Sequence, residues 1–275
     1  MAEIGSPLRE TTRAPRLPGR DTRIEVTDGA LIPVRGQRGA LTAWRLSFFG
    51  AIALLVLLPL IAPKPYWDIY RFLPDGILRT FQVTVLSIAF AFVVGLLTGI
   101  GRISRITIIN RIATVYVEVI RGIPLLVQIF YIYYALGRIV KVPPLASAII
   151  AMAVCYGAYI GEVVRAGIQS IPKGQAEAAH ALGMTRAQAM VHVILPQAFR
   201  VVLPPIGNEF IALLKDSSLV SIIAVADLLR RGREFASESF AYFETYTVIA
   251  LVYLIITLFF SKLIGLLEER LHGGR

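Results

Sequence analysis

Six long apolar segments divide the chain, and polar residues, prolines or glycines bound each of them. A helix needs about 20 predominantly apolar residues to cross the hydrocarbon core of a bilayer. Only the first segment is short, and Trp44 and Trp67 flank it as interfacial aromatic residues do. The pattern predicts an all-α integral membrane protein with six transmembrane helices. These are residues 46–62, 77–101, 112–136, 145–166, 201–225 and 246–267.

The segments outside these spans set the predicted domain organisation. Residues 1–45 hold eight arginines, five carboxylates and few large apolar side chains, which predicts a disordered cytoplasmic tail. Residues 46–76 are expected to form an extra N-terminal helix and an outer loop, and residues 77–267 the transmembrane domain. Residues 268–275 form the predicted cytoplasmic C-terminus.

Composition agrees with the pattern. Hydrophobic residues make up 56% of the chain and charged residues 17%, and the mean hydropathy is +0.68, which is typical of membrane proteins. The single cysteine, Cys155, lies in an apolar segment, so no disulfide can form within the chain. Neither a phosphate-binding GxxxxGK[ST] motif nor a GxSxG or HExxH motif occurs, so we expect no catalysis by this chain.

Basic residues indicate the orientation in the membrane. With the N-terminus in the cytoplasm, the inner segments hold eighteen Lys and Arg residues and the outer segments seven. This excess is the positive-inside pattern. It predicts that both termini and residues 169–197 are cytoplasmic.

The polar stretch 177–196 predicts two short helices between the fourth and fifth spans. The first follows Pro172 and ends at Gly183, which we expect to adopt a left-handed conformation. Thr185, with a glutamine three residues later, has the form of a capping box that opens the second helix, and Pro196 is expected to close it.

The first of these helices has a surface typical of a plug that fits into another protein. It is rich in alanine, which allows a second backbone to approach closely. Only Gln175, Glu177 and His180 give it polar side chains.

Ionisable residues inside the predicted spans need a partner or a function, because each costs about 2.5–3.5 kcal/mol at the centre of a membrane helix. Glu118 and Arg121 lie three residues apart on one helical face, and Glu162 and Arg165 repeat this arrangement. We interpret both pairs first as ion pairs that neutralise each other and fix helix packing.

Two spans contain helix-breaking sequences. Pro124 is expected to break the third span, and Pro204 with Pro205 to open the fifth, which a polar run of four residues then interrupts. Broken membrane helices often carry substrate sites. Glu162 should lie nearer the cytoplasm than Asp216, so one small ligand should not contact both. The candidate substrate pathway comprises Gln128, Glu162, Asn208, Lys215, Asp216, Ser217 and Ser218.

The polar stretch resembles the EAA loop of permease subunits of ATP-binding cassette (ABC) importers. In that loop Glu-Ala-Ala is followed, at fixed spacing, by a glycine and by Ile-x-Leu-Pro; Val193 replaces the isoleucine here. The residues that match are Glu177, Ala178, Ala179, Gly183, Leu195 and Pro196.

Further motifs narrow the resemblance to the polar amino acid uptake branch of this family. Ile123 stands where this branch usually has threonine, and Gly161 where it usually has alanine. The motifs are residues 117–128, 159–168, 203–208 and 214–221.

The resemblance implies a non-catalytic transport subunit of the bacterial inner membrane, which pairs with a second copy or a close paralogue. Each EAA loop, here residues 169–197, would sit in a cleft of a separate ABC ATPase dimer that binds ATP and Mg. An extracytoplasmic solute-binding protein would deliver a polar amino acid, such as glutamine, glutamate, aspartate, histidine or arginine. No cofactor and no nucleic acid are expected in this chain. Five spans are usual in the family, so residues 46–62 would be an addition.

Two alternatives remain open at this point. The chain could be a secondary transporter driven by an ion gradient, with Glu162 and Asp216 as ion-binding groups. It could also be a membrane-tethered helix-turn-helix regulator, because Ala179 and Gly183 have the spacing of such units. The regulator is disfavoured because Arg186 is the single basic residue of the second short helix that could contact DNA phosphates.

Overall fold

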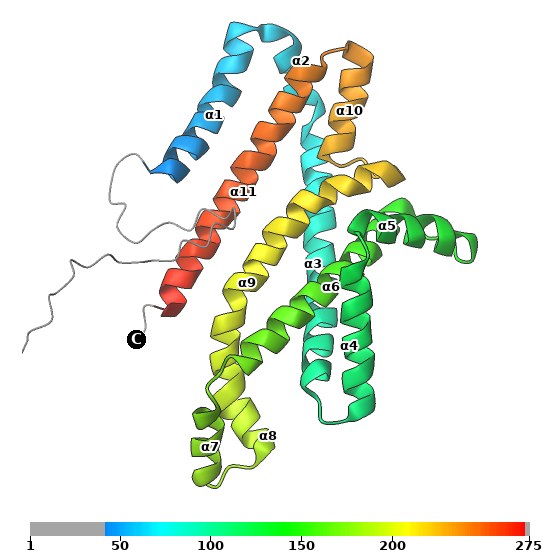
Figure 1. Cartoon of the computed structure of the whole chain (residues 1–275). Coiled ribbons are helices and arrows are strands. Elements are labelled where there is room, and N and C mark those ends of the chain that lie inside the picture. The colour runs from blue at the N-terminus through cyan, green and yellow to red at the C-terminus, as the bar shows by residue number, and fades with distance from the viewer. Residues whose placement is uncertain (1–41, 273–275) are drawn as a thin grey trace, which may run out of the picture. The chain divides into compact units, whose positions relative to one another are not determined.

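The computed structural model describes residues 42–272, and no strand occurs in this part of the chain (Figure 1). The elements are α1 (Ala43–Ile61), α2 (Pro63–Phe72), α3 (Pro74–Ile103), α4 (Thr107–Gly122), α5 (Leu125–Phe130), η1 (Tyr131–Ala135), η2 (Leu136–Arg138), α6 (Pro144–Gln169), α7 (Lys173–Ala181), α8 (Arg186–Ala189), η3 (Met190–Ile194), α9 (Leu195–Asp216), η4 (Ser217–Ile223), α10 (Leu228–Ser239) and α11 (Tyr242–His272).

Five of the described helices are long and apolar enough to cross a membrane, which confirms the all-α membrane fold. They are α1, α3, α6, the run from α8 to η4, and α11. The bent pair formed by α4 and the segment 125–138 makes a sixth span if it is counted as one.

The first span begins three residues earlier than predicted. Thr42 caps α1 through its hydroxyl, which accepts a hydrogen bond from the backbone N–H of Arg45 at 3.3 Å. The predicted disordered tail otherwise falls on residues 1–41, which lie outside the described part of the chain.

The third span is not one straight helix. It bends by 103° between Gly122 and Leu125, because Pro124 cannot donate a backbone hydrogen bond. Gln128 satisfies the carbonyls that the bend leaves free: its side-chain amide donates to Ile120 O at 2.9 Å and to Ile123 O at 2.8 Å. The position of the break was predicted, but the size of the bend was not.

The predicted start of the fifth span was wrong. Pro196 does not close the EAA loop but lies in the first turn of α9, and the helix is continuous from Arg186. Pro204 and Pro205 lie inside α9 rather than at its start. The π-helical turn η3 directly precedes Pro196, and its wider winding gives the proline ring room. The predicted interruption is confirmed, since α9 gives way to the 3-10 helix η4 at Ser217.

Helices α3 and α6 form the most extensive helix–helix contact of the described bundle. A Cβ atom added at Gly95 would lie 2.6 Å from Ile160 Cβ, and one added at Gly157 would lie 2.9 Å from Val94 Cβ. Glycines on both helices thus let the two backbones approach closely.

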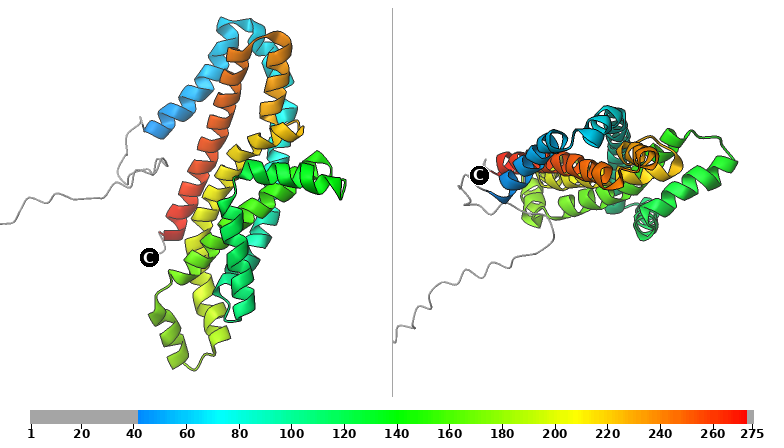
Figure 2. Two further views of the ribbon diagram at one scale, coloured as in Figure 1. Left: turned by 45° about the vertical axis from the view of Figure 1, so that its right-hand side comes forward. Right: turned by 90° about the horizontal axis from the view of Figure 1, so that it is seen from above.

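A second hydrophobic cluster joins the N-terminal helices to the C-terminal ones. Ile69 of α2 is buried there with Leu228 of α10 and Val248 of α11. Trp44 Nε1 also donates to Leu258 O at 3.0 Å, which fixes α1 beside α11 (Figures 1 and 2). Helices α2 and α10 lie at the end opposite to α7 and α8 (Figures 1 and 2).

Candidate functional site

The EAA loop has the two-helix form that its sequence predicts. Pro172 stands at the N-cap of α7, and α7 ends before Gly183, whose φ is +82°. The Gly183 N–H donates to His180 O at 2.9 Å, and the Met184 N–H to Ala179 O at 3.1 Å. Glycine adopts this left-handed turn without a steric penalty, so the tip of the loop has a defined shape.

The second helix is fixed by its predicted capping box. The Gln188 N–H donates to Thr185 Oγ1 at 3.3 Å, and the Thr185 N–H donates to Gln188 Oε1 at 2.9 Å. Gln197 at the start of α9 donates to Gln175 Oε1 of α7 at 3.2 Å. The loop is therefore held by its own side chains before any partner docks.

The six residues of the EAA match divide into an outer and an inner group. Ala179 is 3% exposed and Leu195 half-buried, so both pack within the chain. The outer group presents a small apolar surface beside one carboxylate, and next to it Leu182 is 81% exposed. The exposed matching residues are Glu177, Ala178, Gly183 and Pro196.

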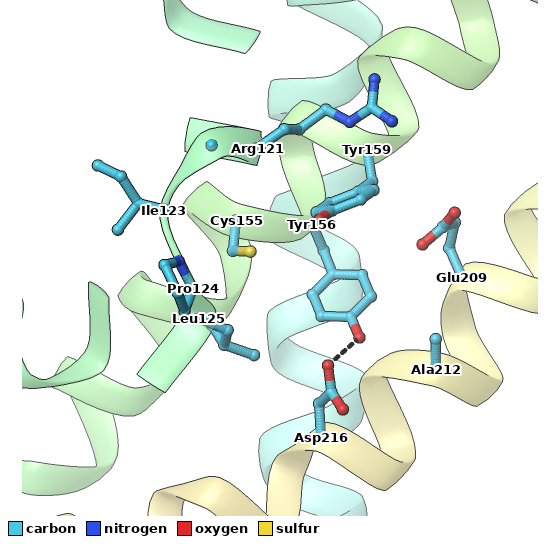
Figure 3. A pocket seen from close by; sticks show the side chains of 11 residues that line it. Arg121, Ile123, Pro124, Leu125, Cys155, Tyr156, Tyr159, Glu209, Ala212 and Asp216 are labelled. Atoms are coloured by element: carbon cyan, nitrogen blue, oxygen red, sulfur yellow. Dashed lines mark hydrogen bonds between the residues drawn. The ribbon is translucent and has the colours of Figure 1, made fainter. Parts of the chain in front are cut away.

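A cavity of about 470 Å³ lies where the third span breaks, between α4, α6 and α9 (Figure 3). Arg121 and Pro124 border it on one side, and Glu209 and Asp216 of α9 on the other. The aromatic side chains of α6 between these walls are Tyr156 and Tyr159.

Polar and aromatic contacts orient the cavity side chains. The Tyr156 hydroxyl donates to Asp216 Oδ2 at 2.7 Å, and the guanidinium carbon of Arg121 lies 5.0 Å from the centre of the Tyr159 ring (Figure 3). One cation and two carboxylates therefore face one space, which gives it groups for both charges of a zwitterion. The described residues contain no cluster of His, Cys, Asp and Glu suited to a metal ion.

The candidate pathway residues do not gather in one place. Asp216 lines the cavity, whereas Asn208 and Lys215 are exposed on α9. Ser217 is fully buried and donates to Leu214 O at 2.7 Å, and Ser218 is half-buried. Gln128 lies at the bend of the third span, where its side-chain amide donates hydrogen bonds to two backbone carbonyls.

Glu162 lies in a separate cluster toward the cytoplasmic end predicted for α6. Arg165 Nε donates to Glu162 Oε2 at 2.9 Å, and Arg102 of α3 binds the same carboxylate. The predicted Glu162–Arg165 ion pair is confirmed. The predicted Glu118–Arg121 pair is wrong, because Arg121 turns instead to Tyr159, and no ion pair of Glu118 occurs within residues 42–272.

Of the residues that line the cavity, only Asp216 was among the sequence candidates for the substrate pathway. The charged and aromatic lining residues that were not among them are Arg121, Tyr156, Tyr159 and Glu209. Glu209 and Asp216 lie seven residues apart, with Ala212 between them, so they share one helical face. That spacing could have shown, from the sequence alone, that these two carboxylates lie on one side of the helix. Nothing local in the sequence indicates that α4 and α6 face the same space.

A helical bundle with an ionisable cavity in its interior and a preformed docking loop at one end has the make-up of a membrane permease. Over residues 91–273 the chain matches the family described as the inner membrane component of binding-protein-dependent transport systems. The chain therefore belongs to this family of permease subunits.

Individual relatives agree with the family match. The L-cystine transport system permease protein of Bacillus subtilis is 40% identical over 213 residues, which cover 77% of this chain and 90% of the relative. The glutamine transport system permease protein of Escherichia coli is 40% identical over 208 residues, which cover 74% and 95%. A crystal structure of an amino acid ABC transporter with histidines matches with a TM-score of 0.71 at 42% identity and covers 73% of this chain and 94% of that one.

Proposed function

We propose that this chain carries a polar amino acid inward across the bacterial inner membrane as the permease subunit of an ABC importer. The residues of the EAA loop carry the proposal, because one side of the loop packs on the bundle while Glu177, Ala178, Leu182 and Gly183 stay exposed. The names of the relatives, which include glutamine and L-cystine permeases, support the substrate class. They give no support to an ion-driven transporter or a DNA-binding regulator.

The EAA loop is the proposed docking site for one subunit of an ABC ATPase dimer. Ala178 and Leu182 offer an exposed apolar surface, and Glu177 offers a carboxylate next to it. A Cβ atom added at Gly183 would meet none of the described residues within 4 Å apart from its chain neighbours, so a partner can approach this backbone closely. ATP and Mg would be bound by that partner, so this chain needs no cofactor of its own.

The cavity at the bend is the proposed substrate pathway in this chain. Its volume of about 470 Å³ falls in the range of about 300–1,000 Å³ that is usual for small-molecule sites. Arg121 would bind the carboxylate of an amino acid, and Glu209 or Asp216 its ammonium group. The arrangement favours a zwitterion over a sugar or a simple ion.

The remaining partners follow from the same assignment. The permease would pair with a second copy or a close paralogue and receive the amino acid from an extracytoplasmic solute-binding protein. The positive-inside pattern supports an orientation with the EAA loop and both termini in the cytoplasm, in which α2 and α10 would face the solute-binding protein.

Reconstitution tests this function. The chain would be co-purified with a candidate ABC ATPase, combined with a candidate solute-binding protein from the same organism, inserted into liposomes and supplied with radiolabelled amino acids. We expect uptake that requires all three proteins and internal ATP. Uptake by this chain alone, driven by a proton or sodium gradient, would show the proposal to be wrong.

A further inference from the structure

Two side chains of opposite charge lie in the spanning segments without a partner of their own. Glu118 lies one turn before the end of α4 and Lys215 one residue before the end of α9, and both are exposed. Neither makes an ion pair or a side-chain hydrogen bond within residues 42–272. Charged groups at this depth are rarely directed at lipid. Something other than lipid must therefore cover both.

The surroundings of Glu118 form one continuous face of α4. Ile112, Val115 and Val119 recur at helical spacing around Glu118 and are 66%, 58% and 52% exposed. A Cβ atom added at Gly122, on the same face, would meet nothing within 4 Å, so the packing of this chain does not require glycine there. An apolar helix face with one acid in it and a glycine at its end suits a second protein helix.

Lys215 belongs to a corresponding face on α9. Pro205, Asn208 and Lys215 are exposed at spacings of three and seven residues, next to the stripe that lines the cavity. The α4 face borders the same cavity from the opposite side, through Arg121 and Gly122 (Figure 3). The two faces therefore lie beside opposite sides of one cavity, one with an acid and one with a base that have no ion pair within residues 42–272.

Two-fold symmetry joins these faces. In a symmetric pair whose axis runs along the membrane normal, the α4 flank of one copy meets the α9 flank of the other, and the reverse contact forms at the same time. We propose that a second copy of this chain covers the cavity opening and that Glu118 pairs with Lys215 of the partner subunit, twice in each dimer. This rests on the proposed pairing of two permease chains and assigns its contact.

Cross-linking between differently tagged chains tests the contact directly. Both chains would carry Cys155→Ala, which removes the single cysteine; one would also carry Glu118→Cys and the other Lys215→Cys. A short bis-methanethiosulfonate linker suits the Cα separation of a Glu–Lys pair better than a direct disulfide does. We expect most of the protein to appear as a linked dimer on a gel. The matched control replaces Lys215→Cys by Val85→Cys, an exposed position on α3, and should give at least tenfold less dimer.

Charge reversal provides the second readout. Glu118→Lys or Lys215→Glu alone should lower the co-purification of two differently tagged copies at least fivefold, and the double variant should recover more than half of it. No linked dimer, or a double variant as poor as the single ones, would overturn the contact. The uptake assay separates the two proposals: a linked dimer without ATP-driven uptake counts against the transport function alone, and uptake without a link counts against this contact alone.

Discussion

Glycines occupy the contact between α3 and α6 and also the tip of the EAA loop, but their surroundings are opposite. A Cβ atom at Gly99 would lie 2.7 Å from Val164 Cβ and 2.8 Å from the carbonyl oxygen of Gly161. A Cβ atom at Gly183 would meet none of the described residues within 4 Å apart from its chain neighbours, and the constraint there is the backbone, with φ at +82°. Gly99 is needed because the backbone of α6 leaves no room for a side chain. Gly183 is needed because its backbone adopts a left-handed turn, although there is room for a side chain.

The alanines of the two regions differ in the same way. Ala158 of α6 is fully buried in the bundle, whereas Ala178 of the EAA loop is exposed. The α3–α6 contact is thus complete within one chain, and the EAA loop is not. Substitutions in the first region should act on folding, and substitutions in the second on the response to a partner.

The largest effect is expected from Gly99→Leu. The side chain would have to displace the backbone carbonyl of Gly161, so we expect a loss of stability of about 3 kcal/mol and poor recovery of folded protein. Thermal unfolding in detergent measures this. Gly50→Leu in α1, where nothing lies within 4 Å, should leave the midpoint nearly unchanged. Equal midpoints for the two variants would contradict the role given to the α3–α6 contact.

Gly183→Arg should act on transport instead. We expect a folded protein, destabilised by about 1–2 kcal/mol through the left-handed backbone, with uptake reduced about a hundredfold because the ATPase no longer docks closely. Proteoliposome uptake and ATP hydrolysis would be measured together. Gly183→Asn, which tolerates this backbone, should retain most of the uptake. Undiminished uptake by Gly183→Arg would refute the coupling role.

The cavity gives an intermediate effect. Asp216→Asn should lower uptake about tenfold, because it removes the negative charge of a carboxylate that lines the cavity and accepts a hydrogen bond from the Tyr156 hydroxyl. Glu118→Gln should lower it less than threefold, since glutamine can still accept a hydrogen bond from a lysine of the partner. Both would be measured as initial uptake rates. Equal and small effects would indicate that both carboxylates serve packing alone.

The last prediction concerns stability alone and the carboxyl of Asp227, which caps α10 by accepting a hydrogen bond from the Arg230 N–H at 3.1 Å. Burial raises the pKa of this carboxyl from 3.8 to about 6, so between about pH 4 and 6 the folded state binds the proton more tightly than the unfolded state. Stability should therefore fall as pH rises through this window, by at most about 1.4 kcal/mol per pH unit. Asp227→Asn keeps the cap and should remove this slope from unfolding curves. A parallel slope in the variant would contradict the assignment.

Much of the fold could be predicted because its signals are local. The apolar segments placed the spans, and Pro172, Gly183 and Thr185 placed both helices of the EAA loop, since caps and turns depend on a few neighbouring residues. Pro196 was wrongly predicted to close the EAA loop. The π-helical turn before it lets the helix continue, and the presence of a proline does not reveal such a turn.

Less of the cavity could be predicted. Asp216 stood out as a charge in an apolar span, but the roles of Arg121 and Tyr159 depend on the bend that brings the end of α4 over α6. The spacing of residues along a helix shows which side chains lie on the same face of that helix. It does not show which faces of different helices pack against each other. The spacing of Glu209 and Asp216 was therefore readable, and their shared space with Arg121 was not.

Continuous helix connects the EAA loop to two of the elements that line the cavity, α6 and α9. From Tyr159, α6 continues to Gln169, about 15 Å along the axis, and from Glu209 the helix runs back to Arg186, about 35 Å away. Both helices therefore lead from the cavity to the same two short helices, α7 and α8. If an ATPase docks on the EAA loop as proposed, we expect a movement of that loop to reach the cavity through both helices at once.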